Sequence, residues 1–374
     1  MAGLPSRIMN IGVPKESVAQ EARVALVPES VGWLVKAGVR VTVQAGAGAA
    51  AGFSDEAYQK AGASLGDAGD VFGGSDLIAK VQRPDERELG WLRPGSLLVC
   101  LMQPASAAAA IRALEARGVT AFALEKVPRI TRAQSMDVLS SQATVAGYKA
   151  VLLGAAALAK FLPMLTTAAG TIAPSKCCVL GAGVAGLQAI ATARRLGAVV
   201  SAFDVRPAAA EQIRSLGASV VAQELIAAGA EGAGGYAKEQ SAEQQQRIQE
   251  ALRTHLAGMD LVITTAQIPG KPAPRLISSE TVRSLAPGSV IVDLAAESGG
   301  NCEATKPGET VEVGGVRILG PLNLPATMPQ HASQMLSRNI LTFLKHLLTK
   351  EGSFKVDRAD EITGAMLVTQ AAPA

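Results

Sequence analysis

The stretch that most constrains the fold runs from residue 175 to residue 206, SKCCVLGAGVAGLQAIATARRLGAVVSAFDVR. An apolar run with the length of a buried strand precedes three glycines in G-x-G-x-x-G spacing, and a helical pattern follows them. Gly181 permits a tight turn, Gly183 lets the backbone approach a pyrophosphate, and Gly186 allows the helix to pack close to the strand. The free N–H groups at the start of the helix then face the phosphates. The pattern predicts a Rossmann-type dinucleotide site.

A second apolar run ends in Asp204, about 20 residues after the glycines, where this type of site carries an acidic residue. A carboxylate there accepts hydrogen bonds from the ribose hydroxyls of the adenosine half and repels a 2′-phosphate. The sequence therefore favours NAD(H) over NADP(H). Arg206 keeps the second cofactor open, because an arginine can accept a 2′-phosphate.

Length and composition set further bounds. A chain of 374 residues predicts two domains, each with its own core. The formal net charge is +3 and no basic cluster is interleaved with aromatic residues, so nucleic acid is not an expected partner. The 4 cysteines lack C-x-x-C spacing, which predicts reduced cytosolic thiols and no metal site. The start has no signal-peptide pattern, and Lys160 and Pro163 interrupt the most apolar stretch, so a soluble chain is expected.

The chain before the fingerprint predicts a first α/β unit that has no fingerprint of its own. Apolar runs suited to buried parallel strands cover residues 8–13, 39–44, 77–81, 97–102 and 120–124. Helical patterns lie between them at residues 29–37, 54–61 and 105–117, and Ser54 is the expected N-cap of the second. After a polar connection that starts at residue 128, a long inter-domain helix is expected over residues 140–161.

Past Asp204, the patterns predict helices at residues 208–216, 242–256 and 280–285, and strands at residues 218–222, 261–265, 290–294 and 317–319. Residues 225–239 are rich in Gly and Ala and too long for an ordinary connection, which predicts a mobile loop. An amphipathic helix over residues 326–348 is expected to return to the first unit. We therefore predict an α/β fold of two Rossmann-like doubly wound parallel-sheet domains around a cleft. The first takes residues 1–127 and 330–374, and the second takes residues 128–329.

A series of motifs extends over nearly the whole chain: IGVPKE, RVALVPESV, KVQRP, PRITRAQSMDVLSSQ, GGYAKE, TTAQIPGKPAP and DLAAESGGN. With these motifs, the sequence resembles the NAD(H)-binding component of proton-translocating NAD(P) transhydrogenases, which is called domain I and forms the first portion of the alpha subunit. It is more distantly similar to alanine dehydrogenases. The segment PRITRAQSMDVLSSQ is the most specific, because the equivalent connection of alanine dehydrogenases has a different composition.

The resemblance implies that this segment surrounds the nicotinamide end of NAD(H). The side chains of Gln134 and Ser140 can pair with a carboxamide, and Arg129 can hold Asp137 by charge-assisted hydrogen bonds. Gln134 is also implied to face the neighbouring NADP(H) component. Alternatively, Arg129 and Asp137 only cap and pair at the start of the connecting helix. The implied catalytic set is Arg129, Gln134, Asp137 and Ser140, with Ser135 and Met136 as further cofactor contacts.

The resemblance also implies contacts with the rest of the cofactor. Gly235 and Tyr236 match a mobile loop that folds over bound nucleotide, although Tyr236 could instead be a surface aromatic that anchors the loop. Thr265 follows an expected strand, where open α/β sheets bind ligands, whereas a loop residue such as Gln267 is commonly only solvated. The implied contacts are Gly181, Gly183, Val184, Gly186, Asp204, Val205, Arg206, Gly235, Tyr236, Thr265, Ala266 and Gln267.

The comparison with alanine dehydrogenases is informative through its differences. Arg23 and Lys80 match their substrate-binding arginine and lysine, but Met102 replaces their catalytic histidine and Glu297 their catalytic aspartate. Oxidising an amino acid requires groups that move protons while hydride leaves carbon. Arg23 and Lys80 are therefore interpreted as structural ion-pair partners, with a retained substrate site as the alternative.

The function implied by the resemblance is the NAD(H) half of a Si-specific, proton-translocating NAD(P) transhydrogenase. Hydride would pass directly between NAD(H) on this chain and NADP(H) on a partner. The implied partners are a second copy of the chain in a homodimer, an NADP(H)-binding component and a membrane component that conducts protons. These would hold a cytoplasmic chain at the inner membrane. The alternatives are an alanine dehydrogenase-like amino-acid oxidoreductase and a redox-sensing NAD-binding module without chemistry.

Overall fold

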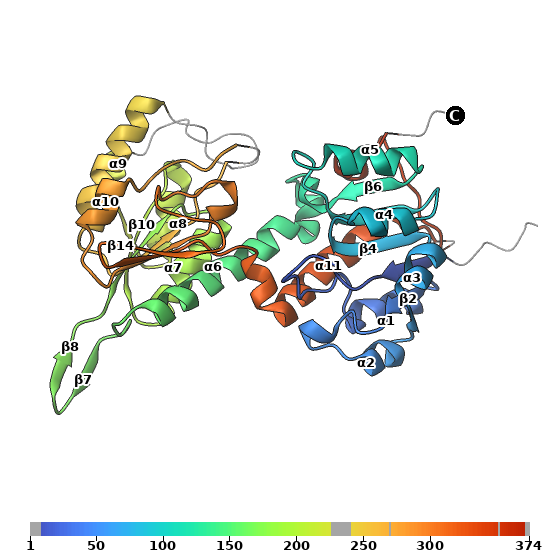
Figure 1. Cartoon of the computed structure of the whole chain (residues 1–374), viewed down its shortest axis with the longest axis horizontal. Coiled ribbons are helices and arrows are strands. Elements are labelled where there is room, and N and C mark those ends of the chain that lie inside the picture. The colour runs from blue at the N-terminus through green and yellow to red at the C-terminus, as the bar shows by residue number, and fades with distance from the viewer. Residues whose placement is uncertain (1–8, 226–240, 269–270, 351, 371–374) are drawn as a thin grey trace, which may run out of the picture. The chain divides into compact units, whose positions relative to one another are not determined.

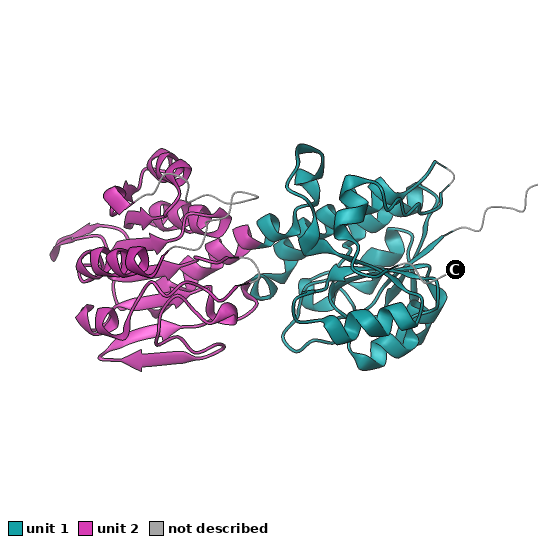
Figure 2. Cartoon of the chain, turned by 90° about the horizontal axis from the view of Figure 1, so that it is seen from above, with its two compact units in different colours: residues 1–142, 325–374 teal, residues 143–324 magenta. Residues whose placement is uncertain are grey.

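The computed structural model describes residues 9–225, 241–268, 271–350 and 352–370. The chain divides into two compact units, which are described separately: residues 1–142 with 325–374, and residues 143–324 (Figure 2). The sequence-based boundaries were at residues 127 and 330. The division after residue 142 differs because the first turn of the long helix and the segment before it pack with the first unit.

The first unit is built on a parallel sheet of 6 strands in the order β3-β2-β1-β4-β5-β6. Its chain leaves β1 toward β2 and β3, and then returns to β4 on the other side of β1. The gap between β1 and β4 is therefore the topological switch point of this sheet. The strands are β1 (Asn10–Val13), β2 (Arg40–Gln44), β3 (Ser64–Gly66), β4 (Leu77–Gln82), β5 (Leu97–Leu101) and β6 (Thr120–Ala123).

Helices cover both faces of the first sheet, because alternate side chains of its strands point to opposite sides. Leu77 packs in one cluster with helix α11, whereas Ile78 packs in another with α3 and α5. Phe122 and Phe343 meet edge to face at 5.2 Å where α11 lies on β6. The helices are α1 (Pro28–Lys36), α2 (Asp55–Lys60), α3 (Ala68–Gly74), α4 (Glu86–Trp91), α5 (Ala108–Ala116), α11 (Pro329–Leu347) and α12 (Glu361–Met366).

The second unit has a sheet of 7 strands in the order β11-β10-β9-β12-β13-β15-β14, parallel except for β14. The chain leaves β9 toward β10 and β11 and resumes at β12 on the other side, so the switch point lies between β9 and β12. The strands are β9 (Lys176–Leu180), β10 (Val199–Phe203), β11 (Ser219–Val220), β12 (Leu261–Thr264), β13 (Val290–Asp293), β14 (Thr310–Val313) and β15 (Val316–Leu319).

The continuous apolar runs of this sheet are explained by burial of both faces. Cys177 and Val179 pack beneath α6, α7 and α8, and Cys178 and Leu180 pack beneath α9 and α10. A hairpin of β7 (Leu165–Thr167) and β8 (Gly170–Ile172) extends from this unit (Figure 1). The helices are α6 (Val138–Ala157), α7 (Val184–Arg195), α8 (Pro207–Ser215), α9 (Ala242–Leu256) and α10 (Ser279–Ser284).

These two sheets confirm the predicted fold class of Rossmann-like, doubly wound domains. Ser54 caps α2 as predicted, with its hydroxyl accepting from the N–H of Ala57 at 3.3 Å. The sequence patterns missed the short or partly exposed elements β3, β7, β8, β14, α3, α4 and α12.

All four cysteines lie among the described residues and are buried with free thiols. Desolvation raises the pKa of each thiol above its ordinary value, so the neutral form dominates. Within the described portion of the chain, no helix has the length and apolar character needed to cross a membrane.

Candidate nucleotide-binding site

The glycine turn lies between β9 and α7, as its spacing predicts. Gly181 has φ +95°, a left-handed conformation that favours glycine. A Cβ on Gly186 would lie 1.8 Å from the carbonyl oxygen of Gly181, so only glycine lets α7 approach the end of β9. By contrast, no atom lies within 4 Å of a Cβ placed on Gly183. The turn is closed toward the protein at Gly181 and Gly186 and open at Gly183, where a pyrophosphate would approach.

This turn lies at the switch point of the second sheet. Gly181 follows β9 and Thr265 follows the neighbouring strand β12. The N–H of Thr265 donates to the carbonyl of Leu180 at 2.8 Å, and its hydroxyl donates to the carbonyl of Gly181 at 3.0 Å. Open α/β sheets bind ligands outside the carboxyl ends of the strands at such a point. The structure thus brings Thr265 and the glycine turn together, as expected for one site.

Asp204 ends β10 and is held against the same turn. Its Oδ2 accepts from the N–H of Ala182 at 2.7 Å, and the carboxylate is 7% exposed. The guanidinium of Arg206 folds back onto it, with Nε 2.9 Å from Oδ1 and Nη2 2.8 Å from Oδ2. The arginine that left NADP(H) open in the sequence therefore forms an ion pair with the acid that argues for NAD(H). A ribose would share this carboxylate with Arg206 or displace the guanidinium.

The remaining predicted contacts in the second unit differ in exposure. Val184 begins α7 and is 41% exposed, whereas Val205 is half-buried against the apolar cluster beneath α9 and α10. Ala266 is half-buried beside the turn. Gln267 is exposed, and its amide donates to the carbonyl of Leu294 at 3.2 Å. The predicted contacts Gly235 and Tyr236 lie outside the described residues.

The polar segment predicted to hold the nicotinamide belongs to the first unit. Arg129, Gln134 and Ser135 are exposed on and before the short helix Thr131–Met136. Asp137 caps the start of α6, since its carboxylate accepts from the N–H of Ser140 at 2.9 Å and from the Ser140 hydroxyl at 2.6 Å. The capping role left open by the sequence is therefore present for Asp137. It does not prevent a ligand contact, because both Asp137 and Ser140 are only half-buried.

Met136 departs from the expectation. Its side chain is 4% exposed and packs in the core of the first unit. A buried thioether in that core has no surface for a cofactor, so the expected contact through the Met136 side chain is wrong. An apolar residue in the middle of a polar segment is better explained as the anchor that holds its exposed neighbours in place.

The switch point of the first sheet carries buried charges that neutralise one another. Lys80 on β4 is fully buried, with Nζ 2.6 Å from Glu88 and 3.7 Å from Glu16. Arg23 forms a bidentate pair with Glu21, at 2.8 Å through Nε and 2.6 Å through Nη2. These contacts agree with the interpretation of Arg23 and Lys80 as ion-pair partners, because each cation already has a carboxylate in contact.

Neither residue that replaces an alanine dehydrogenase acid–base group is placed for proton transfer. Met102 is fully buried in the first unit, and its N–H donates to Glu125 at 3.2 Å. Glu297 is exposed in the second unit, where its carboxylate accepts from the N–H of Asn323 at 2.8 Å. Among the described residues, no group of three or more His, Cys, Asp and Glu side chains could hold a metal ion.

Glu16 gives the first unit a pH dependence that can be measured. Burial raises the pKa of its carboxyl from 4.5 to about 7, against the opposing effect of Lys80. The folded protein therefore binds this proton more tightly than the unfolded chain does. The resulting stabilisation is complete below about pH 4.5 and is lost as the pH rises through about 7.

We expect Glu16→Gln, which imitates the protonated carboxyl, to remove this loss. At about 1.4 kcal/mol per pKa unit, the free energy of unfolding of the wild type should fall by about 3 kcal/mol more than that of the variant between about pH 5 and pH 8. Urea unfolding at a series of pH values measures the difference. Glu29→Gln, at an exposed position of α1, is the control. Equal pH slopes for Glu16→Gln and the wild type would contradict the assignment.

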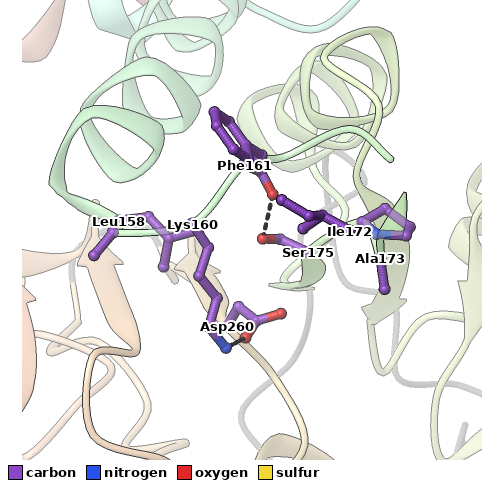
Figure 3. A pocket seen from close by; sticks show the side chains of 9 residues that line it. Leu158, Lys160, Phe161, Ile172, Ala173, Ser175 and Asp260 are labelled. Atoms are coloured by element: carbon purple, nitrogen blue, oxygen red, sulfur yellow. Dashed lines mark hydrogen bonds and ion pairs between the residues drawn. The ribbon is translucent and has the colours of Figure 1, made fainter. Parts of the chain in front are cut away.

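A separate cavity of about 750 Å³ opens at the opposite edge of the second sheet (Figure 3). Lys160 and Asp260 pair across it at 2.5 Å, and Ser175 donates to the carbonyl of Phe161 at 2.7 Å. Asp260 precedes β12 and Ser175 precedes β9. The cavity therefore lies at the amino ends of the strands, whereas the glycine turn lies at their carboxyl ends, so it does not belong to the nucleotide site.

Two doubly wound sheets, with a glycine turn and an acidic strand end at the switch point of the second, define a dinucleotide-binding type of α/β protein. The comparisons make this class more specific. The model of the alanine dehydrogenase/PNT N-terminal domain matches residues 12–146, and that of the C-terminal domain matches residues 150–373. The chain belongs to the alanine dehydrogenase/PNT family.

Within this family, the chain groups with NAD(P) transhydrogenase alpha subunits. It is 45% identical over 362 residues to the first of the separate chains that make up NAD(P) transhydrogenase subunit alpha of Rhodospirillum rubrum, covering 95% of this chain and 94% of that protein. The solved transhydrogenase from Sinorhizobium meliloti is 46% identical with a TM-score of 0.88, covering 97% of this chain and 99% of that one. Alanine dehydrogenase of Bacillus subtilis is 31% identical over 351 residues, 91% of this chain and 86% of that protein. The family resemblance inferred from the motifs is confirmed.

Sequence reasoning missed several polar partners at the two switch points. Glu16, Glu21 and Glu88 were not singled out, although each carries a buried ion pair or hydrogen bond. Asp293 and Asn301 were also missed. One signal was available for Asp293, since it ends the apolar run VIVD as Asp204 ends VSAFD. No local pattern marks the other residues.

Proposed function

We propose that this chain is the NAD(H)-binding subunit of a proton-translocating NAD(P) transhydrogenase. The observation that carries the proposal is the arrangement at the second switch point. Gly183 leaves open space beside the start of α7, while Asp204 and Thr265 border the same turn. An extended dinucleotide needs these features together: a place for its pyrophosphate, a carboxylate for its ribose and a strand end along which it can lie.

The residues of this chain have binding and orienting roles in such a reaction. When bound, NAD(H) supplies or accepts the hydride, so that NADH and NADP⁺ give NAD⁺ and NADPH. No proton is gained or lost at the two rings, and the protein needs no acid, base or nucleophile for the transfer itself. It must hold one ring against another in the correct orientation and exclude water. The exposed Gln134 and the half-buried Ser140 are suited to binding a carboxamide.

The first unit supports the transfer between nucleotides over amino-acid oxidation. An amino-acid oxidoreductase needs cations free for a substrate carboxylate and a group that accepts a proton. Here Lys80 and Arg23 are buried in contact with carboxylates, and Met102 stands where a histidine would be required. We assign these charges to the stability of the first unit.

The proposal includes the partners of the reaction. NADP(H) would bind to a second component, and a membrane component would couple the transfer to proton movement. The relatives named alpha subunits support an assembly of several subunits. We further propose a homodimer of this chain, held at the cytoplasmic face of the inner membrane by the other components, with the Si-specific stereochemistry of the family.

Reconstitution tests the proposed function directly. The purified chain is mixed with an NADP(H)-binding component, and hydride transfer from NADPH to an NAD⁺ analogue is followed by absorbance. We expect transfer only when both proteins are present. Tight NADH binding without transfer would favour a redox-sensing module. Oxidation of NADH that depends on pyruvate and ammonia, catalysed by this chain alone, would instead establish the amino-acid oxidoreductase.

Gln134→Asn tests the proposed orienting role. Shortening an exposed side chain by one methylene leaves the packing of its segment intact but withdraws the amide from its place. We expect hydride transfer to slow by about tenfold or more while the Kd for NADH changes by less than about twofold. Stopped-flow transfer and NADH fluorescence measure the two effects. Thr131→Ser, at an exposed neighbour, is the control. Equal losses in transfer and binding would count against the role.

A further inference from the structure

Asn301 is a fully buried polar residue at the edge of the candidate site. It lies beyond β13 and directs its amide at the loop that follows β12. Its Nδ2 donates to the carbonyls of Ala266 and Pro274, both at 2.8 Å, and its Oδ1 accepts from the N–H of Ala266 at 3.0 Å. One side chain thus satisfies both backbone groups of Ala266 and joins the two ends of the loop.

Asp293 holds the backbone that carries this amide. The carboxylate is fully buried at the end of β13, and its Oδ2 accepts from the N–H groups of Asn301 at 2.8 Å and Cys302 at 3.0 Å. The same oxygen accepts from the hydroxyl of Thr305 at 2.7 Å. Oδ1 accepts from the hydroxyl of Thr264, the last residue of β12, at 2.8 Å. Asn301 is therefore anchored from below before it contacts the loop.

The loop transmits this placement to the glycine turn. Thr265, next to Ala266, donates its hydroxyl to the carbonyl of Gly181 at 3.0 Å. A Cβ on Gly181 would lie 2.8 Å from that hydroxyl and 3.0 Å from the nitrogen of Ala266, so loop and turn fit together without slack. A displacement of Ala266 must therefore shift Thr265 against Gly181 or separate the two.

We propose that Asn301 is a positioning residue of the nucleotide site. It acts through Ala266 and Thr265, fixing the strand-end loop against the glycine turn, and it does not itself contact the cofactor. The inference rests on the proposed function, because it assigns a role within that same site. The residue type follows from the geometry. Only a side-chain amide offers two donors and an acceptor on one short arm, whereas aspartate cannot donate and serine cannot reach three partners.

The first experiment compares Asn301→Ala with a matched control in the full chain. Ser289→Ala removes a buried hydrogen bond, from Ser289 Oγ to the carbonyl of Met259 at 3.1 Å, at the amino end of β13. Both variants should lower the unfolding temperature to a similar extent. We expect the Kd for NADH to rise about tenfold in Asn301→Ala and less than about twofold in Ser289→Ala. Unchanged NADH affinity in a folded Asn301→Ala chain would overturn the proposal, as would equal losses in both variants.

A second pair of variants keeps the proposal testable if Asn301→Ala does not fold. Thr265→Val keeps the shape of the side chain but removes the hydroxyl that holds Gly181, and Thr265→Ser restores that hydroxyl. We expect weaker NADH binding in Thr265→Val and recovery in Thr265→Ser. Where Asn301→Ala folds, the double variant with Thr265→Val should lose less affinity than the product of the two single losses, because both act on one loop. Wild-type affinity in Thr265→Val, or independent effects in the double variant, would contradict the route through Thr265.

These outcomes are separable from failure of the proposed function. If the wild-type chain binds NADH but transfers no hydride with an NADP(H)-binding component, the proposed reaction fails while the positioning role is still measured by NADH affinity. If the wild-type chain does not bind NADH, both fail together. If transfer occurs and Asn301→Ala changes neither NADH affinity nor the transfer rate at saturating NADH, only the positioning role fails.

Discussion

Replacing Gly186 with alanine should abolish NADH binding and destabilise the second unit. The added Cβ would lie 1.8 Å from the carbonyl oxygen of Gly181 and 2.8 Å from its carbonyl carbon, and both atoms belong to the backbone. Relief requires α7 to move away from β9 and opens the turn that faces the phosphates. Overpacking of a core usually costs about 1–3 kcal/mol, and a backbone clash of this kind belongs at or above the upper end. Thermal unfolding and NADH fluorescence measure the two losses.

Gly183→Ala is the matched control, because it places the same methyl group 3 residues earlier, where no atom lies within 4 Å. We expect its unfolding temperature to stay close to that of the wild type. Its affinity for NADH should still fall by about tenfold or more, because the methyl projects where a pyrophosphate would approach. If Gly183→Ala binds NADH like the wild type, the cofactor does not approach the turn at this point. A stable, NADH-binding Gly186→Ala would show that α7 tolerates displacement.

Asp204→Ala should weaken NADH binding strongly and relax the discrimination against NADPH. The change removes the proposed ribose acceptor, the 2.7 Å anchor of the Ala182 N–H and the partner of the Arg206 guanidinium. Hydrogen bonds to charged groups contribute about 1.5–3 kcal/mol each, so the Kd for NADH should rise by about 100-fold. Arg206, released from its ion pair, becomes available to a 2′-phosphate. Titration with NADH and NADPH measures both affinities.

The double variant Asp204→Ala/Arg206→Ala separates the two causes. It should bind NADH as poorly as Asp204→Ala and should lose the gain for NADPH, since no guanidinium remains. If Asp204→Ala leaves the preference for NADH over NADPH unchanged, the carboxylate does not face the ribose. If the double variant keeps the gain for NADPH, relief of charge repulsion is the cause, and Arg206 does not contribute to it.

Much of the fold could be predicted from the sequence, because the core strands are continuous apolar runs between recognisable helix signals. The missed elements lack that signal. β3 has three residues and no buried side chain, and α3 is interrupted by the glycines of AGDVFGG. The edge strand β14 alternates exposed and half-buried residues. Such elements form because the neighbouring strand or helix is already in place, which no short window of sequence records.

The candidate site was predictable where chemistry and spacing coincide in one segment. The glycine turn and Asp204 are examples, since a strand, a turn and a second strand occur within about 30 residues, as in a βαβ unit. The partners that come from elsewhere were not predictable. Asn301 reaches Ala266 across 35 positions of the chain, and Arg23 reaches Gln142 across 119. Met136 shows the opposite failure, because a motif position implied a ligand contact for a side chain that packing places in the core.

The four buried thiols make this chain a convenient background for site-directed labelling. A maleimide or nitroxide reagent reacts with the exposed thiolate, and burial denies Cys100, Cys177, Cys178 and Cys302 both exposure and ionisation. A cysteine introduced at an exposed position such as Ser135 would then carry the label alone, with the native cysteines kept in place. Spectroscopic probes can thereby be attached beside the proposed nicotinamide segment while every core residue stays unchanged.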